Sequence, residues 1–243
     1  MIGKPHTLQA IATRRRAGQS GNEIIEFGLL MLMLMPILFG SFVLGMNLIK
    51  SNTANSLASQ IGDMYIHGGD FTTYPMQQMT QRMATGMNLQ IGSSFTGNNR
   101  NNTGNTTGDG RVVTAQIMYI GGTTSPSCQA VVAPATCVNH DSFVYLEYCE
   151  FGNSAVTFNS TIGPPNSSIS ISSAGKVSNW VTDSNAKLQS TAQSAMAAIW
   201  QVTGTDRAPL VDQQVVYVAE TFFRTPSLTL GVTSPGIYSR SFH

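Results

Sequence analysis

The sequence has few charged residues. Lys, Arg, Asp and Glu make up 10% of its 243 residues, against about 25% in an average soluble domain. The formal net charge is +1, but residues 1–21 hold four cations and no acid, so the rest of the chain has 9 minus 12, or −3. No strongly basic surface of the kind that binds nucleic acid is therefore expected. Asn, Ser, Thr and Gly supply the polarity instead, as in many exported and surface proteins. We therefore expect no nucleic-acid partner.

Signatures of common catalytic sites are also missing. The sequence contains no G-x-S-x-G, no phosphate-binding P-loop, no H-E-x-x-H and no G-x-G-x-x-G. The four histidines are dispersed, and the pair His140-Asp141 is interpreted as a turn before a strand. Glu147 and Glu150 are three residues apart, so in a strand they would face opposite sides. These absences predict a protein that is not an enzyme and needs no cofactor.

Cysteine is scarce as well. The three cysteines, Cys128, Cys137 and Cys149, allow one disulfide and one leftover thiol, with three possible pairings. The pair Cys128 and Cys137 is placed first because it closes a short loop. A zinc site is not expected, since no C-x-x-C occurs and the nearest histidine, His140, is alone.

One long apolar run is present. From Phe27 to Ile49 there are 23 residues without a charge, which in a helix would extend about 35 Å. This is enough to cross a bilayer core of about 30 Å. Three arginines at positions 14–16 precede the run, and no acid occurs before Glu23. Since cationic flanks stay inside, the N-terminus is predicted to be cytoplasmic and the chain after Lys50 to lie outside.

An acid at the start of this run needs an explanation. Glu26 follows two isoleucines and precedes Phe27, and a carboxylate in lipid costs about 2.5 kcal/mol or more unless it is paired. Gly21 lies five residues before Glu26. If the chain were cut after Gly21, the new amine of Asn22 and the carboxylate of Glu26 would be about one helical turn apart.

This arrangement resembles a known export signal. Arginines, then Gly21, four residues, Glu26-Phe27 and an apolar helix that contains Pro36 resemble the class III signal of type IV pilins. The match is closest to the TadE-like pseudopilins of the tight-adherence (Flp) pilus system, and it covers residues 14 to 60. The resemblance implies that a prepilin peptidase cleaves after Gly21 and that Asn22 becomes the first residue.

The resemblance also implies partners and a location. Glu26 and Phe27 would engage neighbouring pilins or pseudopilins and the tight-adherence assembly platform. The chain would be a single-pass protein of the bacterial inner membrane, surrounded by membrane lipid, with its C-terminal domain periplasmic or extracellular or in the pilus.

Two alternatives stay open at this point. Gly18 and Glu23 have the same spacing as Gly21 and Glu26, although cleavage after Gly18 would leave a polar stretch where the pattern has apolar residues. The second alternative is an uncleaved single-pass anchor that carries an extracytoplasmic binding domain.

Three residues of the apolar run bear on helix packing. Pro36 removes one backbone hydrogen bond and predicts a kink or a local loosening. Ser41 and Gly45 are four apart and share one face, a spacing that lets helices approach closely. Their alternative interpretation is scattered small residues that face lipid.

The whole chain is predicted to have an α+β fold. We expect a leader at residues 1–21, a transmembrane and spine helix at 22–67, and an exported domain at 68–243 with an antiparallel sheet and one or two further helices. The spine helix should pack on the domain through an apolar stripe. The stripe comprises Leu57, Ile61, Met64 and Tyr65.

The exported domain is predicted in outline. A helix is expected at 73–89, with a buried stripe of methionines at positions 76, 79, 83 and 87, and another helix ends near Trp200. Strands are expected at 111–120, 142–151 and 215–223. Short edge strands are expected at Ala155–Phe158 and Ile169–Ile171, and residues 96–110 read as an exposed loop.

Overall fold

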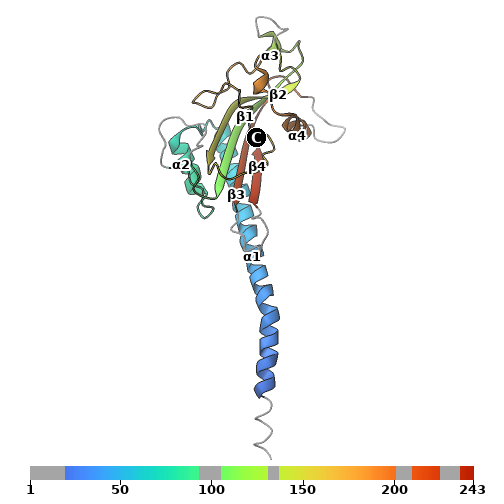
Figure 1. The fold of residues 1–243 in the computed structure, drawn as a ribbon. Helices are drawn as coiled ribbons and strands as arrows, with labels where there is room; N and C mark the ends of the chain where they lie inside the picture. Colours follow the sequence, from blue (N-terminus) through green and yellow to red (C-terminus); the bar gives the residue numbers. More distant parts are fainter. Residues whose placement is uncertain (1–19, 93–104, 131–136, 201–209, 225–235) are drawn as a thin grey trace, which may run out of the picture. The chain divides into compact units, whose positions relative to one another are not determined.

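The chain divides into two compact units in a computed structural model that describes residues 20–92, 105–130, 137–200, 210–224 and 236–243. The units are Met1–Leu48 and Ile49–His243. The elements are four α-helices, a short 3₁₀ helix and four strands in the described ranges (Figure 1): α1 Ser20–Ile66, α2 Tyr74–Met83, β1 Gly110–Ile120, α3 Pro126–Gln129, β2 Ser142–Gly152, η2 Ser184–Ala186, α4 Ser190–Trp200, β3 Val215–Arg224 and β4 Gly236–Phe242. The α+β class with a long N-terminal apolar helix is thereby confirmed.

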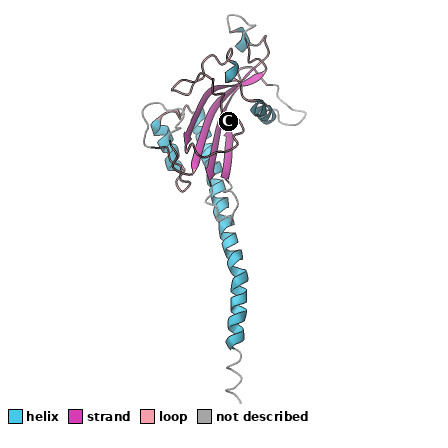
Figure 2. Cartoon of the chain, viewed as in Figure 1, coloured by secondary structure: helices cyan, strands magenta, loops and turns pink. Residues whose placement is uncertain are grey.

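The second unit is built on one four-stranded antiparallel sheet (Figure 2). Its strand order is β2-β1-β3-β4. Three of the strands begin and end within two residues of the expected ranges, because each is a long β-branched and aromatic run. The pairing of β1 with β2 shifts register between Gln116 and Ile117, which is the mark of a bulge.

One face of the sheet is covered by the end of α1. Leu57, Ile61 and Tyr65 are buried there against Phe151 and Phe223. Ala54 and Ala58 are also buried, and their small side chains let the helix lie close to the strands. The apolar stripe expected in this part of the helix is confirmed, and Met64 is partly buried beside it.

The helix ends where the sequence indicates. α1 stops at Ile66, and Gly68 follows with a φ of +85°, a left-handed conformation that glycine adopts without strain. The Gly69 N–H donates to the Met64 carbonyl at 2.8 Å. These bonds satisfy carbonyls that the helix leaves open at its end.

The opposite face of the sheet has its own core. Tyr145 and Val218 pack there with Ala192 and Met196 of α4. The Tyr145 hydroxyl donates to the Ile162 carbonyl at 2.7 Å. Because both faces are covered, the strands read as near-continuous apolar runs rather than as alternating ones.

A buried carboxylate ties a loop to this face. Glu220 of β3 is 0% exposed, and it accepts hydrogen bonds from Ser160, from the Thr161 N–H at 2.9 Å and from the Tyr238 hydroxyl at 2.5 Å. A buried charge is tolerated only when hydrogen bonds or an opposite charge compensate for the lost water, and these three hydrogen bonds supply that compensation to both oxygens of the carboxylate. Burial and the Glu220 charge raise the pKa of Tyr238, so its hydroxyl stays a donor.

Several sequence expectations are wrong in detail. Ala155–Phe158 forms no strand, because the carbonyls of Ala155 and Val156 accept from arginine side chains, Arg224 and Arg111, instead of from a strand. Ile169–Ile171 contributes only an isolated bridge between Ile171 and Val177.

The helix expected at 73–89 is shorter in the structure, and its methionine stripe is confirmed except at Met79. α2 ends at Met83, and Gly86 follows with a φ of +87°. Met87 is buried, and Met76 and Met83 pack against the same core. Met79 is 52% exposed, whereas Gln77 and Thr80 are buried. The buried face of α2 is therefore more polar than the methionine spacing indicates. Residues 96–104 of the expected loop lie outside the described residues.

We expect Ile61→Ala to lower the free energy of unfolding by about 2–5 kcal/mol, because it leaves a cavity between α1 and the sheet. Ile66→Ala is a matched control, since Ile66 lies in the same helix but is exposed, and it should cost less than about 1 kcal/mol. Denaturant unfolding of the full chain in detergent micelles measures both. Equal losses would contradict the packing of Ile61 against the sheet.

Candidate functional site: an uncovered apolar helix

The first half of α1 has no protein cover. Every side chain from Glu23 to Phe42 is exposed, and Leu32 reaches 76%. The large apolar side chains are exposed on all sides of the helix: Ile24, Ile25, Phe27, Leu29, Leu30, Met31, Leu32, Met33, Leu34, Met35, Ile37, Leu38, Phe39, Phe42, Leu44, Met46, Leu48 and Ile49. A soluble protein does not leave an apolar surface of this kind in water.

This segment fits a single-pass membrane anchor. Among the described residues, one helix region, Glu23–Ile66, is long and apolar enough to cross a membrane, and its most apolar window is not buried. Thirteen Leu, Ile, Phe and Val residues occur between Phe27 and Ile49. At about 0.3–0.6 kcal/mol each, they favour insertion by about 4–8 kcal/mol, which exceeds the cost of one charge of about 2.5–3.5 kcal/mol.

Glu26 lies near the start of this helix with its side chain exposed. Among the described residues, none forms an ion pair with it. Phe27 is exposed beside it. Gly21 and Asn22 belong to the first turn of α1, so residues 22 and 26 are related by the i, i+4 spacing at which helix positions are neighbours.

The residues expected to govern helix packing are accessible too. Pro36 lies inside α1, where it leaves the carbonyl of Leu32 without its helical N–H. Ser41 donates to the Leu38 carbonyl at 2.9 Å and so does not repair that gap. A Cβ placed on Gly45 would meet nothing within 4 Å, so a neighbouring helix has room to approach there.

The cysteines belong to the other unit. Cys128 and Cys137 form a disulfide, which is the pairing placed first from the sequence. Cys149 is a buried free thiol that donates to the Phe71 carbonyl at 3.2 Å. Burial raises the pKa of Cys149, so it stays protonated and is a poor nucleophile.

The histidines and acidic residues of the second unit do not gather into a metal site in the described ranges. No three His, Cys, Asp or Glu side chains there are grouped so that they would hold a metal ion. His140 and Asp141 contact each other at 3.2 Å on the surface. Glu150 pairs with Arg111, whereas Glu147 lies on the other face of the sheet, as their spacing predicts.

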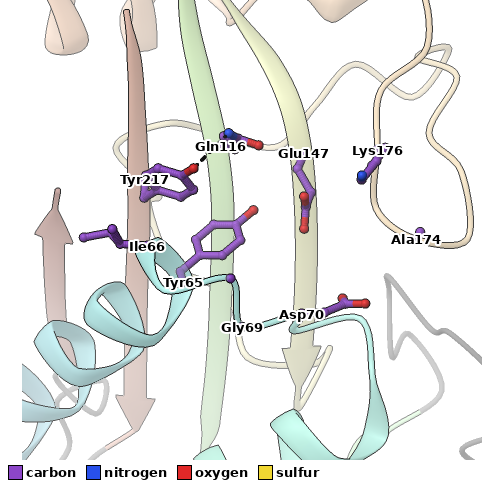
Figure 3. A pocket seen from close by; sticks show the side chains of 10 residues that line it. Tyr65, Ile66, Gly69, Asp70, Gln116, Glu147, Ala174, Lys176 and Tyr217 are labelled. Atoms are coloured by element: carbon purple, nitrogen blue, oxygen red, sulfur yellow. Dashed lines mark hydrogen bonds between the residues drawn. The ribbon is translucent and has the colours of Figure 1, made fainter.

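The second unit contains a cleft that the sequence patterns do not predict. Its volume is about 360 Å³ (Figure 3), and the lining residues come from five separate segments: Tyr65, Ile66, Gly68, Gly69, Asp70, Gln116, Glu147, Ala174, Lys176 and Tyr217. The sequence signal for this cleft is a set of polar residues at paired positions of neighbouring strands. These positions can be recognised as paired only once the strand register is known.

Comparison of the chain with models of protein families, with curated proteins and with solved structures finds no match. The motif around Glu26 and the exposed helix that carries it are therefore the features of this chain that bear on its function.

We expect the double variant Leu34→Arg/Leu38→Arg to leave the membrane fraction. Two arginines at the helix centre cost about 5–7 kcal/mol together, which offsets most of the insertion energy. Ser56→Arg/Gln60→Arg is the matched control, because it places the same charges at the same spacing on exposed positions of the same helix. Carbonate extraction of membranes separates the two, and retention of both variants would contradict a membrane span at residues 27–49.

Proposed function

We propose that this chain is a minor pilin or pseudopilin of a tight-adherence pilus system. The observation that supports this most directly is Glu26 on an uncovered apolar helix, five residues after Gly21 and directly before Phe27. A membrane anchor alone needs no acid at this position, and the acid carries a cost in lipid. A partner that supplies a positive charge explains why it is there.

The proposed action is helix packing after one proteolytic cut. A prepilin peptidase removes residues 1–21 and leaves Asn22 with a free amine. The positive end of the helix dipole lies at the same place, so a carboxylate from an adjacent subunit is stabilised there. Glu26 of one subunit and the amine of another would then neutralise each other, which is the condition for burying both.

The remaining features of the helix agree with this action. Gly45 and Ser41 offer a face of small side chains to a neighbour, and Pro36 leaves a carbonyl that a neighbour or a water molecule can satisfy. The proposed orientation has the arginines at 14–16 in the cytoplasm and the second unit outside. The Cys128–Cys137 disulfide supports it, because disulfides persist in oxidising compartments.

We expect Gly21→Val to block processing, because a branched side chain would occupy the site where the peptidase needs glycine. Mass spectrometry of the membrane-fraction protein should give a start at Asn22 for the wild type and at the original N-terminus for Gly21→Val. Gly18→Val is the control and should still be cut. A wild-type start at Gln19 would move the site to Gly18, and an intact wild type would favour an uncleaved anchor.

We expect Glu26→Ala to be processed normally but to enter assemblies at least about ten-fold less, since removing one partner of a buried ion pair costs about 3–5 kcal/mol. Glu23→Ala is the matched control, because it removes a carboxylate of the same kind three residues earlier on the same helix. Crosslinking and pull-down with co-expressed pilins of the same system measure incorporation. Equal incorporation of both variants would remove the ion-pair role.

A further inference from the structure

The cleft of the second unit has a polar floor on the face of the sheet that α1 covers. Gln116 of β1 lies directly opposite Glu147 of β2 and Tyr217 of β3, so three polar side chains form one row across the sheet. Gln116 donates to the Tyr217 hydroxyl at 3.3 Å. The row lies beside the C-terminal turn of α1, where Tyr65 and Ile66 form one wall of the cleft (Figure 3).

The hydroxyl of Tyr65 points into this cleft toward Glu147 (Figure 3). Tyr65 is only 4% exposed, and its hydroxyl has no hydrogen-bond partner at normal distance and angle among the described residues. Burial raises the pKa of Tyr65 and the Glu147 carboxylate adds to that rise, while Tyr65 lowers the pKa of Glu147 as a weak hydrogen-bonding neighbour. A buried hydroxyl without a full hydrogen bond costs free energy. A polar ligand atom that forms a hydrogen bond with the Tyr65 hydroxyl would recover that cost.

The charges of the cleft favour a cation. Two carboxylates, Asp70 and Glu147, face it, against a single ammonium on Lys176, whose residue is exposed. Burial raises the pKa of Glu147, an effect that Asp70 adds to and that Tyr65 and Lys176 oppose. The ionised form of Glu147 is therefore short of compensating charge.

The aromatic rings add a second reason for a cation. The rings of Tyr65 and Tyr217 lie 5.1 Å apart between centroids in an edge-to-face arrangement, and both line the cleft. Such rings attract ammonium groups and also cover an alkyl chain. A volume of about 360 Å³ is at the small end for ligand sites, which suits a single side chain or a small molecule.

We propose that this cleft binds an alkyl-ammonium group, either a lysine side chain of another polypeptide or a small free amine. The three N–H donors of the ammonium match the Glu147 carboxylate, the Tyr65 hydroxyl and the Asp70 carboxylate. The alkyl chain lies along the tyrosine rings. This inference does not depend on the pilus assignment.

The probes are n-butylammonium chloride and an Nα-acetyl-lysine amide, with n-butanol as the uncharged control. The full chain in detergent micelles, with ring-labelled tyrosine, is titrated with each probe and followed by NMR. Tyr65→Phe and Tyr217→Phe assign the two resonances. We expect both cations to shift the Tyr65 and Tyr217 signals saturably with a Kd on the order of 1 mM, and butanol to give no saturable shift.

The variants separate a charge effect from a loss of folding. Glu147→Gln should raise the Kd about ten-fold, whereas Asp141→Asn, which removes an exposed acid away from the cleft, should leave it unchanged. Lys176→Gln removes the competing cation and should lower the Kd. A gain in affinity is a result that unfolding does not produce.

Each outcome bears on the proposal. Tighter binding of the lysine amide identifies a polypeptide as the source of the ammonium, and tighter binding of butylammonium identifies a free amine. The proposal is overturned if neither cation gives a saturable shift, if butanol binds as well, or if Glu147→Gln and Lys176→Gln both leave the Kd unchanged.

Discussion

The structure depends on one helix, α1, whose first half is exposed and whose last part is buried on one face by the sheet. From Glu23 to Phe42 all side chains of α1 are exposed, whereas from Ala54 to Tyr65 one face is buried against the sheet. The first pattern is apolar all round and the second is apolar on one stripe. Each pattern suits one surrounding: a helix apolar on every side is stable in lipid or among other helices, and an amphipathic one is stable on a protein surface.

The second unit is arranged to receive that amphipathic part. Alanines at 54 and 58 bring the helix close to strands that are also covered from behind by α4. The cover ends with the helix at Ile66, and the polar row of Glu147, Gln116 and Tyr217 begins there. Thus the cleft exists because the helix is shorter than the sheet face on which it lies.

Sequence reasoning located the elements whose signal is local. The strands at 111–120, 142–151 and 215–223 are long β-branched runs with clear ends, and the stripe of Leu57, Ile61 and Tyr65 has helical spacing. β4 was missed because Ser239, Arg240 and Ser241 interrupt its apolar residues, and it is held by pairing with β3 and by Tyr238 on Glu220. The cleft was missed for a similar reason, since its residues meet only through strand register and the end of α1. The role of Glu26 is still a prediction, because it concerns a neighbour that a single chain does not contain.

The contacts of α1 with β3 and β4 affect the order in which the chain folds. Thr221 donates to the Ala54 carbonyl across 167 residues, and Ser239 donates to Asn55 across 184 residues. Contacts this distant in sequence form late in folding. The inner face of residues 54–65 therefore emerges from the ribosome long before the strands that cover it, and during synthesis it is an apolar stripe without its cover.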